Sequence, residues 1–232
     1  MSGPGAAAGA GPPEGVDPPE ELVEVATPGG PARVHVRRPE RPRGVAVLGH
    51  GAGGGLRSVD LTAAVAALVG EGWATALVEQ PWLVAGRRIA GPPRTLDAAW
   101  VPVVESLHAA VGVLAGPGPL LLAGRSAGAR VACRTASSLG AAAVLALSFP
   151  LHPPGRPERS RADELALVLE AGLPLAVVQG ERDPFGGPDE VALHVPVERV
   201  HAVPGTHTVP ASSADAVRDA VAAFARSVLA TS

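Results

Sequence analysis

Six short, largely apolar runs, separated by segments that contain Gly or Pro, constrain the fold of this chain more than any other feature. They cover residues 45–48, 73–78, 120–123, 143–147, 175–178 and 199–203. Strands buried on both faces, as in parallel sheets, have continuous apolar character, whereas half-exposed strands alternate. The runs therefore predict strands in the interior of a mostly parallel sheet.

Segments with helical spacing of apolar residues lie between these runs. They cover residues 59–69, 96–114, 127–139, 162–171 and 213–229. Because parallel strands are joined by right-handed crossovers, this alternation predicts an α/β fold with helices on both faces of the sheet. Residues 21–36 differ, because two short runs flank a Pro/Gly turn at residues 27–31. They predict an antiparallel hairpin at the sheet edge.

Length and apolar content predict one domain. Of the 232 residues 47% are hydrophobic, and no charged or Ser-rich linker divides the chain. We expect a single domain over residues 21–232, without a cap domain, after a disordered tail at residues 1–20, where Gly, Pro and Ala dominate. The tail lacks the pattern of a secretory signal, and no apolar window is long enough for a membrane span.

Charge and residue usage argue against several functional classes. The formal net charge of −3 argues against a nucleic-acid partner. All 19 basic residues are Arg, and a chain without Lys has no Walker A phosphate loop and no Schiff-base lysine. The single Cys133 forms no internal disulfide and argues against a cysteine-based metal site. We expect a cytoplasmic protein with neither metal nor organic cofactor.

The stretch VLGHGAGG, residues 47–54, has two incompatible interpretations. As Gly49-x-Gly51-x-x-Gly54 after a strand, it matches a dinucleotide-binding fingerprint, with Glu79 as the ribose acceptor. As a Gly-rich loop that opens with His50, it matches the oxyanion loop of an acyl-transfer enzyme. The rest of the chain has to decide between them.

The segment GRSAG, residues 124–128, follows a predicted strand and precedes a predicted helix. G-x-S-x-G in this context is the nucleophile elbow, in which flanking glycines permit a sharp and strained turn. We assign Ser126 as the nucleophile. The alternative is that Ser126 is an ordinary helix N-cap.

A serine nucleophile needs a base and an acid that orients the base, and in this type of fold both follow the serine in the sequence. Asp183 lies just beyond one predicted strand and His207 just beyond the next. We assign His207 as general base and acid and Asp183 as the orienting carboxylate. Alternatively, Asp183 begins a turn and His207 belongs to a surface loop. Glu181 and Asp189 are rival acids.

These assignments favour the oxyanion interpretation of residues 47–54. A dinucleotide helix begins within the fingerprint, whereas here the helix is predicted to begin only near Ser58. In the oxyanion interpretation, the backbone N–H of Ala52 or Gly53 is one donor and that of Ala127 is the other. Each such donor typically lowers the barrier by about 3–4 kcal/mol. His50 then shapes the loop and is not a catalytic base.

Together these motifs resemble the α/β-hydrolase superfamily over residues 30–230. They comprise residues 49–54, residues 124–128, the segment QGERD at residues 179–183, and the segment GTH at residues 205–207. More narrowly, the segments QPW at 80–82 and SFPLHP at 148–153 resemble the small, lidless, dienelactone-hydrolase-like branch. That branch includes the testis-expressed protein 30 family and a histone-acetyltransferase complex subunit. The resemblance implies a hydrolase fold, but dienelactone hydrolases use Cys where this chain has Ser126, so their substrate is not implied.

A long connection after the second apolar run, residues 79–95, supplies candidate pocket residues. Trp82 is expected to form a wall of the acyl pocket, and Arg87 and Arg88 to bind an anionic group of the substrate. His152, which follows the fourth run, is a further lining candidate. The alternative is that the arginines are simply solvated. Without a cap, we expect an open, shallow site for small or extended acyl substrates.

Two functional hypotheses follow from the sequence. The first is a serine hydrolase of carboxylesterase or acyl-hydrolase type that acts on a small acyl substrate. The second is a catalytically silent α/β-hydrolase-like protein that binds a partner or ligand. The geometry of Ser126, Asp183 and His207 discriminates between them, because catalysis requires hydrogen bonds among the three side chains.

Overall fold

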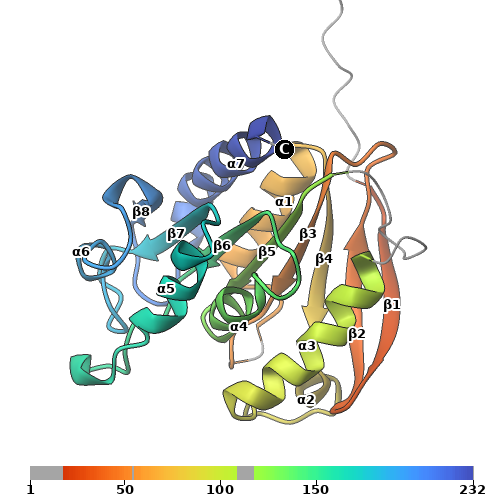
Figure 1. Ribbon diagram of the computed structural model, residues 1–232, viewed down its shortest axis with the longest axis horizontal. Coiled ribbons are helices and arrows are strands. Elements are labelled where there is room, and N and C mark those ends of the chain that lie inside the picture. Colours follow the sequence, from red (N-terminus) through yellow and green to blue (C-terminus); the bar gives the residue numbers. More distant parts are fainter. Residues whose placement is uncertain (1–17, 54, 109–117, 232) are drawn as a thin grey trace, which may run out of the picture.

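A computed structural model describes residues 18–53, 55–108 and 118–231. Within these residues, eight strands form one sheet in the order β1-β2-β4-β3-β5-β6-β7-β8 (Figure 1). The strands are β1 (Glu20–Thr27), β2 (Gly30–Arg37), β3 (Gly44–Gly49), β4 (Trp73–Glu79), β5 (Leu120–Arg125), β6 (Ala143–Leu147), β7 (Leu175–Gly180) and β8 (Val200–Val203). Strands β1 and β2 pair antiparallel, as do β2 and β4, and all other pairs are parallel.

Helices cover both faces of the sheet. They are α1 (Val59–Gly70), α2 (Pro81–Val84), α3 (Pro93–His108), α4 (Ala127–Thr135), α5 (Ala162–Glu170), α6 (Pro188–Val191) and α7 (Ala214–Thr231). Helices α1 and α7 lie together on one face, and α3, α4 and α5 lie on the other (Figure 1). Among the described helices, none is both long and apolar enough to cross a membrane.

The apolar runs are continuous because each central strand contributes side chains to two cores. In β5, Leu120 and Leu122 belong to the core under α3, α4 and α5, whereas Leu121 and Ala123 belong to the core under α1 and α7. All four side chains are buried. A strand with a polar alternate face would leave one of these helix layers without an apolar surface to pack on.

The predicted α/β-hydrolase fold, with its mostly parallel sheet and N-terminal antiparallel hairpin, is confirmed. Helix α3 begins at Pro93, earlier than predicted, and residues 109–114 of its predicted extent lie outside the described residues. Helix α4 ends at Thr135, before the predicted residue 139, and the chain then turns through Gly140, which has a φ of 64°. Residues 1–17 of the predicted tail also lie outside the described residues, and β1 begins at Glu20.

Candidate active site

Ser126 occupies a strained turn between β5 and α4. Its φ of 53° and ψ of −111° lie in a region that non-glycine residues rarely adopt. Glycines permit the turn, because a Cβ on Gly124 would lie 2.4 Å from the carbonyl carbon of Gly128. A Cβ on Gly128 would lie 2.2 Å from the carbonyl oxygen of Gly49 on β3. The Ser126 hydroxyl makes no helix-capping hydrogen bond, so the N-cap alternative does not describe it.

The structure brings Ser126, His207 and Asp183 together in a hydrogen-bonded chain. Ser126 Oγ lies 2.9 Å from His207 Nε2, and His207 Nδ1 lies 2.9 Å from Asp183 Oδ2. In the tautomer that suits both contacts, Nδ1–H donates to the carboxylate and Nε2 accepts from the serine hydroxyl. This arrangement can accept the proton of Ser126 while the carboxylate stabilises the resulting imidazolium.

Asp183 is held by donors that the sequence did not single out. The side-chain amide of Gln179 donates to Asp183 Oδ2 at 3.0 Å, and the backbone N–H of Phe185 donates to Oδ1 at 2.9 Å. Gln179 is fully buried, and the Phe185 ring packs on the His207 imidazole with a centroid distance of 4.2 Å. A glutamine at the end of the apolar run 175–178 was the available signal, because a buried amide in a strand needs partners.

The loops that carry Asp183 and His207 are joined through their backbones. The N–H of Glu181 donates to the carbonyl of Val203 at 2.9 Å, and the N–H of Arg182 donates to the carbonyl of Gly205 at 2.9 Å. Neither rival acid accepts a hydrogen bond from His207, which faces Asp183 alone among the described carboxylates. The distance from the acid to the base is therefore set by the ends of two adjacent parallel strands, β7 and β8.

The loop after β3 is organised around His50. The ring of His50 donates from Nδ1 to the carbonyl of Gly51 at 2.8 Å and accepts the N–H of Gln80 at Nε2 at 3.1 Å. Burial lowers the pKa of His50, and the carbonyl of Gly51 and the charge of Glu79 partly oppose that effect. The imidazole is thus held neutral, as a bridge between the loop and the end of β4.

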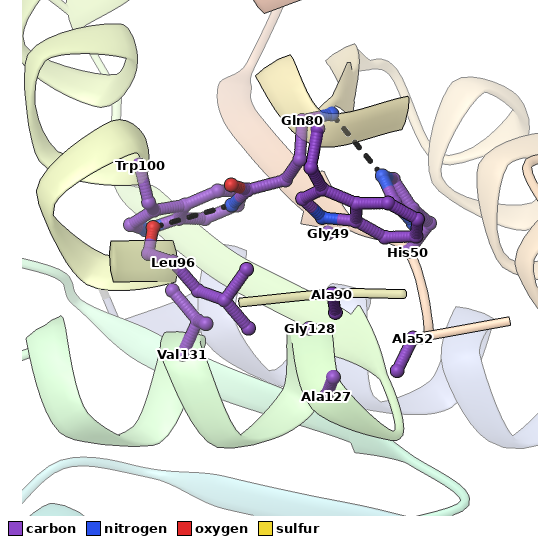
Figure 2. Close-up of a pocket in the computed structure, with 11 residues that line it drawn as sticks. Gly49, His50, Ala52, Gln80, Ala90, Leu96, Trp100, Ala127, Gly128 and Val131 are labelled. Atoms are coloured by element: carbon purple, nitrogen blue, oxygen red, sulfur yellow. Dashed lines mark hydrogen bonds between the residues drawn. The ribbon is translucent and has the colours of Figure 1, made fainter. Parts of the chain in front are cut away.

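Ala52 and Ala127 line the same cavity, although they lie far apart in the sequence. The cavity measures about 10 Å³, roughly the room needed by one water molecule. Figure 2 shows the two alanines on one side of it, opposite Leu96, Gln80 and Trp100. Gly53 lies in the same loop but does not line the cavity. An adjoining cavity of about 160 Å³ shares Ala52 and Ala127 and extends to Arg130 and Arg134 on α4.

The proposed pocket residues of the connection at residues 79–95 differ in whether they line a cavity. Trp82 lines the cavity beside Ala52 and Ala127 and is buried, with its ring 5.3 Å from that of His50. Arg87 and Arg88 are exposed and line neither of these two cavities.

His152 is buried away from both cavities. Its ring bonds the Pro153 carbonyl and the Glu190 carboxylate at 2.9 and 3.0 Å, and these two contacts raise its pKa. His152 is also connected to the acid loop, because its N–H donates to the Phe185 carbonyl at 3.0 Å. Through these contacts His152 supports the loop that carries Asp183, and it does not line either of the two cavities.

The residues of the dinucleotide interpretation, Glu79 and Gly51, make other contacts in the structure. Glu79 accepts a hydrogen bond from Arg33 at 3.3 Å, and helix α1 begins at Val59, well after Gly51. Gly51 packs against Arg125, because a Cβ there would lie 2.7 Å from the Nη1 atom of that arginine. No group of three His, Cys, Asp or Glu side chains in the described part of the chain is placed to hold a metal ion.

Comparison with known proteins identifies the family of the domain. Residues 42–209 match a family model described as an alpha/beta hydrolase domain. No curated protein sequence matches the chain.

Three solved structures illustrate the fold. XC6422 from Xanthomonas campestris, described as a serine hydrolase without a lid, is 20% identical, with a TM-score of 0.69 over 90% of this chain and 94% of that one. Est1E from Butyrivibrio proteoclasticus is 16% identical, with a TM-score of 0.70 over 90% and 99%. A dienelactone hydrolase from Anabaena variabilis is 17% identical, with a TM-score of 0.69 over 90% and 97%. At these identities the likeness is one of fold.

Proposed function

The chain belongs to the alpha/beta hydrolase domain family, and from this premise we propose that it is a serine hydrolase that cleaves an ester or related acyl bond. The observation that carries the proposal is the pair of 2.9 Å contacts that join Ser126 to His207 and His207 to Asp183. We further propose that the chain belongs to the lidless branch that includes the testis-expressed protein 30 family. We also propose that it is an enzyme of carboxylesterase or acyl-hydrolase type.

The proposed reaction begins with attack by Ser126 on the acyl carbon. His207 Nε2 takes the hydroxyl proton as the new O–C bond forms. The backbone N–H groups of Ala52 or Gly53 and of Ala127 stabilise the oxyanion of the tetrahedral intermediate. The imidazolium then gives its proton to the leaving oxygen as the scissile bond breaks, and an acyl-enzyme remains.

Hydrolysis of the acyl-enzyme repeats these roles with water. His207 removes a proton from the water molecule as it attacks the acyl carbon, and Asp183 again stabilises the imidazolium. Collapse of the second tetrahedral intermediate releases the acid, and the proton returns to Ser126. No metal ion and no organic cofactor take part in the proposed reaction.

The cavity of about 160 Å³ beside Ala52 and Ala127 supports a small acyl substrate. It is lined by Ala127, which follows Ser126, and by neither Ser126 nor His207. Since His207 has to reach the leaving oxygen, we assign this cavity to the acyl group and the His207 side of Ser126 to the leaving group. Trp82 lines only the smaller cavity, which has room for about one water molecule, and we keep it as a proposed part of the acyl wall. We keep Arg87, Arg88 and His152 as candidate contacts for a longer substrate.

A fluorophosphonate probe tests the proposal, because it forms a covalent adduct only with an activated serine. We expect one adduct per wild-type chain by intact mass, and no adduct on Ser126→Ala or His207→Ala at the same exposure. Turnover of an ester that the wild type cleaves should fall at least about a thousandfold in both variants.

The exposed Ser137 provides a matched control, and Ser137→Ala should label as the wild type does. An adduct that persists on Ser126→Ala would place the reactive group elsewhere. If folded wild-type protein takes up no probe, the hydrolase proposal fails and a silent binding module becomes the better description.

A further inference from the structure

The side chain before the nucleophile, Arg125, connects two parts of the candidate active site. Its Nη2 donates to the backbone carbonyl oxygen of His207 at 2.6 Å, and its Nε donates to Asp60 Oδ2 at 3.0 Å. The guanidinium is largely buried, with 14% of the side chain exposed, and only 2% of the Asp60 side chain is exposed. A charged pair is therefore held beneath the site, where water screens it little.

Asp60 ties the guanidinium to the first turn of helix α1. Its Oδ1 accepts the backbone N–H of Leu61 at 2.9 Å, and its Oδ2 also accepts the hydroxyl of Ser148 at 3.3 Å. Ser148 follows β6 and has a φ of 46°. Within the described residues, Ser148 and Ser126 are the two non-glycine residues with positive φ. Strained residues persist where their surroundings over-determine them, and here both border one polar network.

Arg125 also sets the path of the loop proposed to stabilise the oxyanion. Gly51 lies so close to the guanidinium that a Cβ there would be 2.7 Å from Nη1. Segments that follow β3, β5 and β8 thus meet at the Arg125 side chain, and Asp60 connects the segment after β6 to it. Among these segments are the loop that precedes Ala52, the strained turn of Ser126, and the backbone of His207.

The hydrogen bond from Arg125 to the backbone of His207 bears on the position of the proposed base, and not on the stability of the fold alone. The imidazole of His207 is oriented by Asp183, but its main chain lies in the irregular segment after β8, where no ladder of strand hydrogen bonds holds it. Arg125 supplies a charged donor to that main chain from the residue adjacent to Ser126. One rigid side chain therefore links the backbone of the base to that of the nucleophile.

We propose that Arg125, anchored by Asp60, is a positioning residue that holds His207 and the loop at Gly51 in register with Ser126. The inference rests on the proposed hydrolase function. Arginine suits this role because its planar fork donates in several fixed directions, whereas a lysine ammonium is a point charge on a flexible stem. A displacement of about 1 Å in such a site is sufficient to lower the rate about a hundredfold.

Arg125→Lys tests the proposal, because it retains the positive charge beside Asp60 and loses the fixed bridge to His207. We expect the fluorophosphonate labelling rate and kcat to fall about 10- to 100-fold with KM within about twofold, while the melting temperature stays close to that of the wild type. Arg33→Lys is the matched control, since Arg33 pairs with Glu79 away from the site, and its kcat should equal that of the wild type.

A neutral double variant, Asp60→Asn with Arg125→Met, covers the case in which Arg125→Lys does not fold. It removes both charges, so neither is left buried without a partner, and the same loss of kcat is expected. Guanidinium at millimolar concentration should restore part of the labelling rate of Arg125→Ala. It should not change the labelling rate of Arg33→Ala.

The inference is overturned if folded Arg125→Lys and the double variant label and turn over at the wild-type rate. It is also overturned if their loss of activity only matches the fraction of unfolded protein. Absence of labelling in the wild type is a different result, because it contradicts the hydrolase function itself.

Discussion

At the residue scale, His50 illustrates a histidine whose surroundings require the neutral form. One ring nitrogen donates to the carbonyl of Gly51 and the other accepts the N–H of Gln80, so protonation would remove the acceptor. Burial lowers its pKa in the folded state. The residue is therefore suited to hold the loop after β3, and poorly suited to exchange protons with a substrate.

This shift predicts a pH dependence of stability. Because the folded-state pKa of His50 lies below the unfolded value, its contribution is present above the unfolded pKa and is lost as pH falls through the folded pKa. We expect the melting temperature of the wild type to fall more steeply between pH 7 and pH 4 than that of His50→Gln. The exposed His194 serves as the control, and His194→Gln should follow the wild-type curve. Parallel curves for all three proteins would contradict the assignment.

At the element scale, the close approach of α4 to the sheet depends on glycine. Gly128 lies against the Gly49 carbonyl of β3, and Gly124 lies against the backbone of Gly128. The first turn of α4 thus lies directly above two central strands, and Ser126 is forced into its strained conformation between them.

Gly128→Ala should therefore be strongly destabilising. The new Cβ would lie 2.2 Å from the Gly49 carbonyl oxygen, and its three nearest atoms all belong to the backbone of Gly49 in the interior of the sheet. We expect the free energy of unfolding in urea to fall by about 1–3 kcal/mol or more. Gly70→Ala, at the end of α1, has no neighbour within 4 Å of its Cβ and should be neutral or slightly stabilising. Equal effects at the two positions would refute the packing argument.

At the scale of the whole molecule, charged side chains join the three helices on one face of the sheet. Glu164 on α5 accepts hydrogen bonds from Arg130 and Arg134 on α4 at 2.6–2.8 Å. Arg134 in turn pairs with Asp97 on α3 at 2.6 Å. Since α3, α4 and α5 lie side by side on that face (Figure 1), the network connects elements that begin far apart in the sequence.

Glu164→Gln tests how much that network contributes to the free energy of unfolding. It leaves two partly buried arginines with weaker acceptors, and we expect the free energy of unfolding to fall by about 2 kcal/mol. Glu71→Gln is the control, because its partner Arg226 is 57% exposed and such surface pairs contribute less than about 1 kcal/mol. Thermal and urea unfolding of the three proteins measure both effects, and a loss at Glu71 as large as that at Glu164 would exclude a special role for the network.

Local patterns in the sequence were sufficient for the architecture and for the choice of candidate residues. Continuous apolar runs identified the buried parallel strands, because a strand covered on both faces has no polar side. The glycines around Ser126 identified the elbow, because only glycine permits that approach of helix to strand. The order Ser126, Asp183, His207 then followed from where the strands end. The catalytic roles of these residues remain predictions until the adduct is measured.

Only the tertiary structure decided which polar residues support the site. Ser148 and Asp60 are 88 residues apart in the sequence, and Arg125 and His207 are 82 apart. As a charged side chain, Arg125 does not differ in the sequence from Arg87 or Arg88. In the structure, Arg125 is largely buried beneath the site, whereas Arg87 and Arg88 are exposed. The physical reason is that apolar periodicity reports on burial against a neighbouring layer, whereas a hydrogen bond between distant loops depends on how the strand ends are brought together.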